Sequence, residues 1–410
     1  APGTKVYVTV DSGAVNMEAA GVIAPTDLPA AIAAGKFATI VKSPGVSRYK
    51  PIFAQAREAG IAVTSNLNIW GETYRNGRTV VAITGTKGKS TTATLVHLML
   101  TESGLDAGLA GNVGLAPLEI ADRHRLVVFE LSSYQTADMA FSPDIAGVTN
   151  LTPEHTDWHR DVDRYYADKL NLIDRDAPIA VALGAGARDN ALVLEAGRDR
   201  KRLIAPLAPF IVDRITTAVK RSKLKGAHNL DNALLAAQLA MKAGANLEAV
   251  IRGIGAFEPL PHRLEEHQIG GTVFVNDSIS TTPEATKAAL NAYEGSRIAL
   301  IAGGHERHQD YTELASLLAP RGVAVLVCLP VTGDRLATAT YRAAPEIEVL
   351  EAATLDAAMQ ALATRRDRFD TAILSPGAPS YGQLEAPGKV FKNFEERGAA
   401  FVRLAAQYFG

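Results

Sequence analysis

Short apolar segments of strand length alternate with segments of helical periodicity along almost the whole chain, and this alternation constrains the fold most. Residues 79–84 are apolar and partly β-branched, as in a buried strand, and residues 89–103 follow as a helix that ends before Gly104. Such alternation is typical of a parallel, doubly wound sheet with helices on its faces. The sequence therefore predicts an α/β protein with mainly parallel sheets. Further strands are expected at residues 5–10, 37–41, 61–64, 126–130, 145–149, 179–183, 272–275, 298–302, 323–327 and 371–374.

A chain of 410 residues has room for several domains, because one domain takes roughly 100–200 residues. We expect three α/β domains, at residues 1–73, 74–266 and 267–410. The polar residues 74–78 are the expected linker between the first two. The first domain starts at a strand that already ends at Asp11, so we expect its opening strand and glycine turn to be missing from this sequence.

The composition indicates a soluble globular protein. Apolar residues make up 47% of the chain, so disorder is not expected, and no apolar run is long enough to span a bilayer. The 42 basic and 44 acidic residues give a formal charge of −2, which argues against nucleic acid or an anionic membrane as the main partner. The single cysteine, Cys328, lies among apolar residues and is expected to be a buried thiol. Without a signal peptide at its start, the chain is expected to be cytoplasmic.

The most specific motif lies between the strand at 79–84 and the helix at 89–103. Glycines there allow backbone N–H groups to point at an anion, and the helix N-terminus adds partial positive charge. Lys89 is placed to reach the terminal phosphates of ATP, and the Ser90 hydroxyl to hold Mg²⁺. The general phosphate-loop pattern would need glycine at Ile83, and an ordinary glycine turn before a helix is the alternative. The expected nucleotide-binding residues of this loop are Gly85, Thr86, Lys87, Gly88, Lys89, Ser90 and Thr91.

Two further groups could complete a metal site. Glu130 ends a predicted strand, where open α/β sheets place their ligands, and its carboxylate suits Mg²⁺. A surface glutamate is the alternative for an isolated residue of this kind. His155 lies in a loop where titratable groups crowd together, so it could bind a second cation or orient the substrate. Lys169, on a probable helix, is by itself an ordinary surface lysine.

The loop sequence Thr-Gly-Thr-x-Gly-Lys-Ser-Thr-Thr resembles the ATP loop of the Mur ligases and of the related folylpolyglutamate synthetases. Other Mur ligase motifs recur in the same order along most of the chain. They are Gly-Asn-Val-Gly at 111–114, Glu-Leu-Ser-Ser-Tyr-Gln at 130–135, His-Asn-Leu-Asp-Asn at 228–232, Leu-Pro-His-Arg-Leu-Glu at 260–265, Asn-Asp-Ser at 276–278 and Lys-Asn-Phe-Glu-Glu-Arg-Gly at 392–398.

The resemblance implies roles for the domains and for individual residues. The first domain would bind a UDP-substrate, the second would be a phosphate-loop ATP-binding domain, and the third a Rossmann-like domain that binds glutamate. Lys169 would be carbamylated by CO₂ and so supply oxygen ligands that a lysine lacks. The implied Mg²⁺ ligands are Ser90, Glu130, His155 and Lys169, and the catalytic residues are Lys89, Glu130, His155 and Lys169. Asn229, Asn232, Arg263 and Asp277 would contact the nucleotide, and Asp11, Asn112, Gln135, Thr281, Arg307, Ser380 and Phe394 the other substrates.

Three departures from the family pattern all touch the amino-acid pocket. Ile279 stands where a lysine is usual, although Thr281 is kept, and Arg307 replaces the lysine that follows a Gly-Gly turn. Residues 384–390 are an apparent insertion. An arginine could bind the side-chain carboxylate of glutamate with two parallel hydrogen bonds, which a lysine cannot.

The activity that the resemblance implies is ATP-dependent ligation of glutamate to the alanine carboxylate of UDP-N-acetylmuramoyl-L-alanine through an acyl-phosphate, in peptidoglycan precursor synthesis. D-glutamate is favoured, and L-glutamate on the same acceptor is an alternative. A folylpolyglutamate synthetase-like ligase and a non-catalytic nucleotide-binding protein are further alternatives. A monomer without a nucleic-acid or membrane partner is expected.

Overall fold

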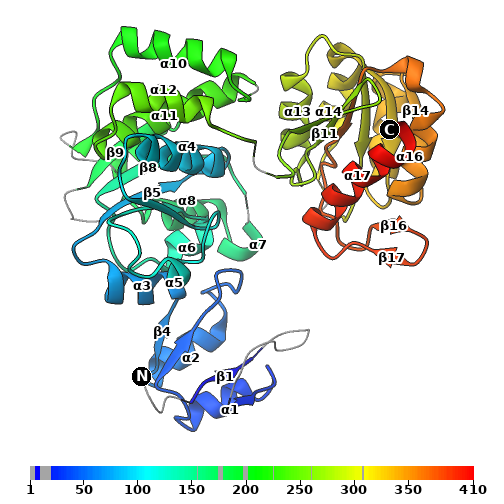
Figure 1. Cartoon of the computed structure of the whole chain (residues 1–410). Coiled ribbons are helices and arrows are strands. Elements are labelled where there is room, and N and C mark those ends of the chain that lie inside the picture. Colours follow the sequence, from blue (N-terminus) through cyan, green and yellow to red (C-terminus); the bar gives the residue numbers. More distant parts are fainter. Residues whose placement is uncertain are drawn as a thin grey trace. The chain divides into compact units, whose positions relative to one another are not determined.

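The computed structural model describes residues 5–9, 20–154, 156–173, 179–196, 202–224, 226–259, 261–306 and 309–410. The chain forms two compact units (Figure 1). The first unit consists of Ala1–Arg221 and Asp231–Ala256, and the second of Ser222–Leu230 and Phe257–Gly410. Three of the predicted site residues, Asp11, His155 and Arg307, lie outside the described residues.

The first unit is built around a parallel five-stranded sheet in the order β6-β7-β5-β8-β9. The chain enters at the central strand, β5, and its neighbours β7 and β8 lie on opposite sides. This reversal of strand order opens a crevice at the carboxyl ends of the strands, where such sheets bind ligands. The strands are β5 (Thr79–Thr84), β6 (Ala107–Gly111), β7 (Leu126–Glu130), β8 (Ile145–Asn150) and β9 (Ala180–Gly186).

Helices pack on both faces of this sheet, which is why the middle residues of β5, β7 and β8 are buried (Figure 1). The described helices are α3 (Asn66–Tyr74), α4 (Lys89–Glu102), α5 (Pro117–Ile120), α6 (Ser133–Asp138), α7 (Thr156–His159), α8 (Val162–Leu170), α9 (Ala191–Ala196), α10 (Pro209–Arg221), α11 (Ala227–Lys242) and α12 (Leu247–Gly255).

The N-terminal segment of the first unit has a small core of its own around Ile32, Ala56 and Ile61. Its described strands form two parallel pairs, β1 with β2 and β3 with β4. The elements are β1 (Tyr7–Val8), β2 (Gly21–Val22), α1 (Leu28–Ala33), β3 (Thr39–Val41), α2 (Pro51–Glu58) and β4 (Ala62–Thr64).

The second unit contains a six-stranded sheet in the order β10-β11-β15-β12-β13-β14, in which β10 is antiparallel to β11 and the other pairs are parallel. Successive side chains point to opposite faces of a strand, so Phe274 and Val275 join separate apolar clusters on the two faces. The elements are β10 (Glu265–Ile269), β11 (Thr272–Asn276), α13 (Pro283–Ala292), β12 (Ile298–Ala302), α14 (Thr312–Leu318), the 3₁₀ helix Ala319–Arg321, β13 (Val323–Cys328), α15 (Gly333–Ala343), β14 (Glu348–Glu351), α16 (Leu355–Ala363), the 3₁₀ helix Arg366–Arg368, β15 (Thr371–Leu374), β16 (Leu384–Ala386), β17 (Lys389–Val390) and α17 (Phe394–Phe409).

The predicted α/β class with mainly parallel sheets is confirmed, while the three domain boundaries stay a prediction. Cys328 is buried at the end of β13, as expected. The apparent insertion at 384–390 forms the antiparallel pair β16–β17. In the part of the chain that the structure describes, no helix has the length and apolar character needed to cross a membrane.

Candidate active site

The loop between β5 and α4 can be built only with glycine at two positions. Gly85 and Gly88 have φ angles of 141° and 81°, values that other residues rarely adopt. A Cβ atom on Gly85 would lie 1.9 Å from Thr149 Oγ1, and one on Gly88 would lie 2.3 Å from Asn232 Oδ1. The backbone is therefore packed closely against the end of β8 and against α11.

Polar residues at the end of β8 and on α8 hold this loop in place. The backbone N–H of Thr86 donates to the carbonyl of Asn150 at 2.9 Å, and that of Lys87 donates to Asn150 Oδ1 at 2.9 Å. Thr149 Oγ1 donates to the Lys87 carbonyl at 2.6 Å, and Thr86 Oγ1 lies 2.9 Å from the Tyr165 hydroxyl. The sequence motifs do not include Thr149 and Asn150, although the carboxyl end of a central strand is a position where ligand-binding residues are expected.

Both lysines of the predicted loop have defined partners. Lys89 Nζ donates to the Thr86 carbonyl at 2.8 Å, so its ammonium lies over the loop. Lys87 is exposed and pairs with Glu154 at 2.7 Å. This ion pair brings residue 154, which precedes His155, to the phosphate loop. The hydroxyl-bearing Ser90 is half-buried in the first turn of α4, and Thr91 is buried next to it.

Lys169 is a buried residue and not the surface lysine that its local sequence suggested. Its side chain is 2% exposed, and its Nζ donates to the Gly85 carbonyl at 2.7 Å. Burial lowers the pKa of Lys169 well below its usual value, and the nearby Lys89 charge lowers it further. The site therefore shifts the equilibrium of this side chain toward the neutral amine.

Glu130 has an oxygen that fits a cation. It lies at the carboxyl end of β7, paired in register with Ile83 of β5, and is 1% exposed. Asn112 Nδ2 donates to Glu130 Oε1 at 3.3 Å, whereas Oε2 is buried without a hydrogen-bond partner among the described residues. A buried carboxylate oxygen is costly unless a donor or a cation satisfies it.

Within the described residues, no group of three or more His, Cys, Asp or Glu side chains could hold a metal ion. A Mg²⁺ ion next to Glu130 would thus need other oxygen ligands, such as hydroxyl, phosphate or carbamate oxygens. The hydroxyl of Ser90 is a group of that kind, and the buried Oε2 of Glu130, unpartnered in the part of the chain that the structure describes, fits the ion. Lys89, Glu130 and Lys169 all lie around the phosphate loop.

Two other predicted residues of this unit are buried in hydrogen-bonded positions. Gln135 caps the start of α6, since its Oε1 accepts from the Ser132 N–H at 3.0 Å. Asn232 on α11 is 8% exposed and its Oδ1 lies 3.5 Å from Thr92 Oγ1. Asn229 is three residues earlier on the same helix.

The second unit carries the other predicted residues at the carboxyl ends of its strands. Asp277 follows β11 and accepts hydrogen bonds from Ser375 Oγ at 2.7 Å and from the Leu264 N–H at 3.3 Å. Burial raises the pKa of Asp277 to about 6. The nearby Arg263 has a buried Nε atom without a hydrogen-bond partner among the described residues.

Arg397, a residue of the Lys-Asn-Phe-Glu-Glu-Arg-Gly motif, links the segments that carry the residues predicted to bind glutamate. It is fully buried in α17 and donates to Ser278 Oγ at 3.0 Å and to the Ser278 carbonyl at 2.8 Å. It also donates to the Ala378 carbonyl, at 3.3 and 3.2 Å, and to Gln383 Oε1. Ser278 Oγ donates in turn to the Phe394 carbonyl at 2.8 Å. The segments after β11 and β15 and the start of α17 are therefore tied together.

Ser380 and Thr281 lie on the segments that this network joins. Ser380 is 4% exposed and accepts from the Gln383 N–H at 3.1 Å. The carbonyl of Thr281 accepts from Gln309 Nε2 at 3.2 Å. Gln383 Nε2 also donates to the carbonyl of Gly303 at 2.9 Å, which connects the Gly-Gly turn after β12 to the same set of loops.

Segments of both units match models of known protein families. Residues 83–202 match the Mur ligase middle domain, and residues 262–377 match the Mur ligase, glutamate ligase domain. Among solved structures, MurF from Acinetobacter baumannii has a TM-score of 0.62 at 16% identity, covering 90% of each chain. MurC from Thermotoga maritima has a TM-score of 0.60 at 18% identity, covering 89% of this chain and 84% of that one. Both structures share the fold of this chain.

Several named relatives are more similar in sequence. The UDP-N-acetylmuramoyl-L-alanine–L-glutamate ligase of a Micromonospora species is 35% identical, covering 88% of this chain and 81% of the relative. The ligase of the same name from Xanthomonas oryzae pv. oryzae is 35% identical over 91% and 83% of the two chains. The UDP-N-acetylmuramoylalanine–D-glutamate ligase of Rubrobacter xylanophilus is 32% identical over 89% and 84%. With this identity over most of its length, and with a phosphate loop braced beside a buried lysine and glutamate, the chain belongs to the Mur ligase family.

Proposed function

We propose that this protein is an ATP-dependent ligase that joins glutamate to the alanine carboxylate of UDP-N-acetylmuramoyl-L-alanine, in the synthesis of peptidoglycan precursors. The observation that carries the proposal is the gathering of Lys89, Glu130 and Lys169 around one phosphate loop in a chain similar to ligases of that name. We expect the enzyme to act as a monomer in the cytoplasm.

Amide formation from a free carboxylate is uphill in water, so the carboxylate has to be activated. In the proposed reaction, an oxygen of the alanine carboxylate attacks the γ-phosphorus of ATP, and ADP leaves. The amine of glutamate then attacks the acyl carbon and loses a proton, and inorganic phosphate leaves. Lys89 and the backbone N–H groups of residues 85–88 would hold the phosphates in place while charge spreads over the transferred group.

Mg²⁺ fits beside Glu130 and would neutralise charge on the phosphoryl oxygens. Its proposed ligands are Ser90, Glu130, His155 and the carbamate of Lys169. Carbamylation is supported by the burial of Lys169, because only the neutral amine reacts with CO₂ and burial favours that form. ¹³C NMR after equilibration with labelled bicarbonate should show a carbamate carbon that is absent from Lys169→Met.

The remaining predicted residues are assigned to the two other ligand groups. Asn229, Asn232, Arg263 and Asp277 are proposed to contact the nucleotide, and Asp11, Asn112 and Gln135 the UDP-substrate. Thr281, Arg307, Ser380 and Phe394 are proposed to bind glutamate. The buried Ser278–Arg397–Gln383 network supports the last assignment, because it fixes the segments on which Ser380 and Phe394 lie.

The enantiomer of the added glutamate is the finer part of the proposal. The family motifs favoured D-glutamate, whereas both the Micromonospora and the Xanthomonas relatives are named for L-glutamate and the less similar Rubrobacter relative for D-glutamate. The departures at Ile279, Arg307 and 384–390 all fall in the amino-acid segments. We therefore propose L-glutamate as the added amino acid.

The test measures ADP release with ATP, Mg²⁺, UDP-N-acetylmuramoyl-L-alanine and either enantiomer of glutamate, followed by chiral analysis of the hydrolysed product. We expect turnover only when acceptor and amino acid are both present, and faster with L-glutamate. Turnover with a pteroate acceptor instead would favour a folylpolyglutamate synthetase, and nucleotide binding without any turnover would favour a non-catalytic protein. Glu130→Gln, which keeps the shape of the side chain, should lower kcat by about 100-fold or more.

A further inference from the structure

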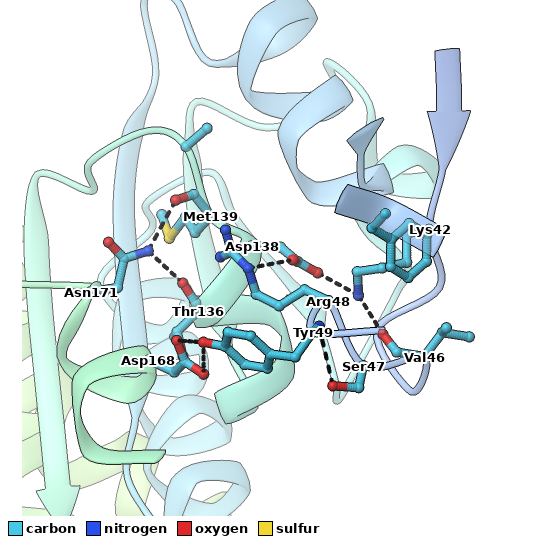
Figure 2. Close-up of polar contacts among 12 residues, drawn as sticks. Lys42, Val46, Ser47, Arg48, Tyr49, Thr136, Asp138, Met139, Asp168 and Asn171 are labelled. Atoms are coloured by element: carbon cyan, nitrogen blue, oxygen red, sulfur yellow. Dashed lines mark hydrogen bonds and ion pairs between the residues drawn. The ribbon is translucent and has the colours of Figure 1, made fainter. Parts of the chain in front are cut away.

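Helix α8, which carries Lys169, is held from two directions. Lys169 reaches the phosphate loop, as described above. The preceding residue, Asp168, projects in a different direction, because consecutive residues on a helix are separated by about 100°. Asp168 instead meets the N-terminal segment of the chain, whose contacts with α6 and α8 are shown in Figure 2.

Asp168 is only 8% exposed and is hydrogen-bonded by two side chains, Tyr49 and His159. The Tyr49 hydroxyl lies 2.6 Å from Oδ1 and 2.7 Å from Oδ2 (Figure 2), and His159 Nδ1 lies 2.7 Å from Oδ2. Burial and the hydrogen bond with Asp168 raise the pKa of Tyr49, which keeps its hydroxyl a donor. Without Tyr49 this buried carboxylate would keep, among the described residues, only the His159 contact, and the lost hydrogen bond costs free energy.

The chain of hydrogen bonds continues through His159 to the start of α6. His159 is fully buried, and its Nε2 lies 2.9 Å from Ser133 Oγ. Because a carboxylate can only accept, His159 Nδ1–H is the donor to Asp168, and the other ring nitrogen faces the Ser133 hydroxyl. Ser133 follows Ser132, whose side chain shares a capping box with Gln135. One polar chain thus connects the N-terminal segment with the helix of Lys169 and the helix start of Gln135.

Tyr49 lies in the loop between β3 and α2, at residues 42–50, which we call the N-terminal loop. Other residues of this loop contact the neighbouring helices. Lys42, 4% exposed, pairs with Asp138 at the end of α6 at 2.7 Å (Figure 2). Ser47 Oγ donates to the carbonyl of Trp158 in α7 at 2.7 Å. The loop is therefore bonded to α6, α7 and α8, and Tyr49 is its contact with α8.

The order serine, histidine, aspartate resembles a hydrolase triad, but the arrangement does not support hydrolysis. Ser133 is 2% exposed, so its hydroxyl has no access to an acyl substrate. A role in holding the helices is consistent with the burial of all three side chains.

We propose that Tyr49, Asp168, His159 and Ser133 form a positioning chain, which makes the orientation of Lys169 depend on docking of the N-terminal loop onto α8. None of the four is a catalytic residue, since they act on the site through Lys169 and through the start of α6. The effect on catalysis rests on the proposed function, whereas the coupling of the loop to α8 can be measured without it.

The first measurement is hydrogen exchange of the full chain without nucleotide. Tyr49→Phe and Asp168→Asn should each raise the exchange rate of the α8 amides by about fivefold or more, because opening of the helix becomes easier. Tyr166→Phe and Asp163→Asn are matched controls on the same helix, and neither residue takes part in the contacts that link Tyr49, Asp168, His159 and Ser133. Both controls should exchange like the wild type. Equal exchange in all variants would overturn the proposal even if the protein is an active ligase.

The second measurement is the Mg²⁺ dependence of ligation for the wild type, the two single variants and the double variant. We expect Tyr49→Phe and Asp168→Asn each to raise the half-saturating Mg²⁺ concentration by about fivefold, and the double variant to add little, because contacting residues are not independent. Additive effects, or a loss of kcat at unchanged Mg²⁺ dependence, would contradict the coupling. An inactive wild type would instead refute the proposed function and leave the exchange result to decide this inference.

Discussion

Asp277 shows what burial does to a single charge in this protein. Its pKa is raised from 3.8 to about 6, mainly because the carboxylate is removed from water. Between these values the folded protein holds a proton that the unfolded chain has released. The free energy of unfolding must therefore fall as the pH rises through this window, and stay lower above it.

The size of this effect follows from the two pKa values. The difference between a pKa of 3.8 and one of about 6 corresponds to a loss of about 3 kcal/mol in the free energy of unfolding, at about 1.36 kcal/mol per pKa unit. Asp277→Asn removes the titration, so its free energy of unfolding should fall less than that of the wild type between pH 4 and pH 6.5. Urea unfolding at several pH values measures the difference. As a control, Asp334 is an exposed aspartate on α15, and Asp334→Asn should show the same change in the free energy of unfolding with pH as the wild type. If Asp277→Asn also showed the same change as the wild type, the buried carboxylate would not titrate in this pH range.

The sequence predicted site residues that depend on their neighbours in the chain better than those that depend on contacts with distant segments. Gly85 and Gly88 could be identified because their φ angles and their neighbours are set by a strand–loop–helix segment of a few residues. The burial of Lys169 depends on a loop more than 80 residues away, and the Tyr49–Asp168 contact joins residues 119 positions apart. Local periodicity holds no information on such contacts, so only the family resemblance singled out Lys169.

At the scale of elements, the position of helix α17 depends on one arginine, Arg397. Arg397 donates only to uncharged acceptors, from Ser278, Ala378 and Gln383, and burial lowers its pKa to about 9. A planar guanidinium can serve three segments at once, whereas an ammonium group offers its donors from a single point. The position of α17 relative to the loops after β11 and β15 is therefore set by the shape of this side chain as well as by its charge.

Arg397→Lys should accordingly destabilise the second unit although it keeps the charge. Loss of two or more hydrogen bonds from a charged donor predicts a decrease of about 2–4 kcal/mol in the free energy of unfolding. Arg403→Lys, on the exposed side of the same helix, should change it by less than about 0.5 kcal/mol. Urea denaturation of both variants tests this, and similar values for the two would mean that the buried network is not important for stability.

Many strands followed the sequence, whereas β6, β10 and β14 lie in segments where no strand was predicted. Strands β5, β7 and β12 have the bounds that their apolar runs predicted, because these strands are buried on both faces. The segment at 384–390 was recognised only as an insertion, and its antiparallel pairing depends on neighbours that periodicity does not reveal. Arg397 lay in a recognised motif, but a single sequence could not show that it would be buried.

At the scale of the whole molecule, the chain has separate apolar cores in its two units. Cores that do not share side chains can unfold in separate cooperative transitions. We therefore expect two transitions in calorimetry or in urea unfolding, each belonging to one unit.

A matched pair of core variants assigns the transitions. Leu95 in α4 and Leu362 in α16 are both fully buried, and a leucine-to-alanine change at such a site costs about 2–5 kcal/mol through lost burial and the cavity left behind. Leu95→Ala should lower the midpoint of one transition and Leu362→Ala that of the other. If each variant lowered both midpoints equally, the units would unfold together, and a ligand bound to one of them would then stabilise the whole chain by mass action.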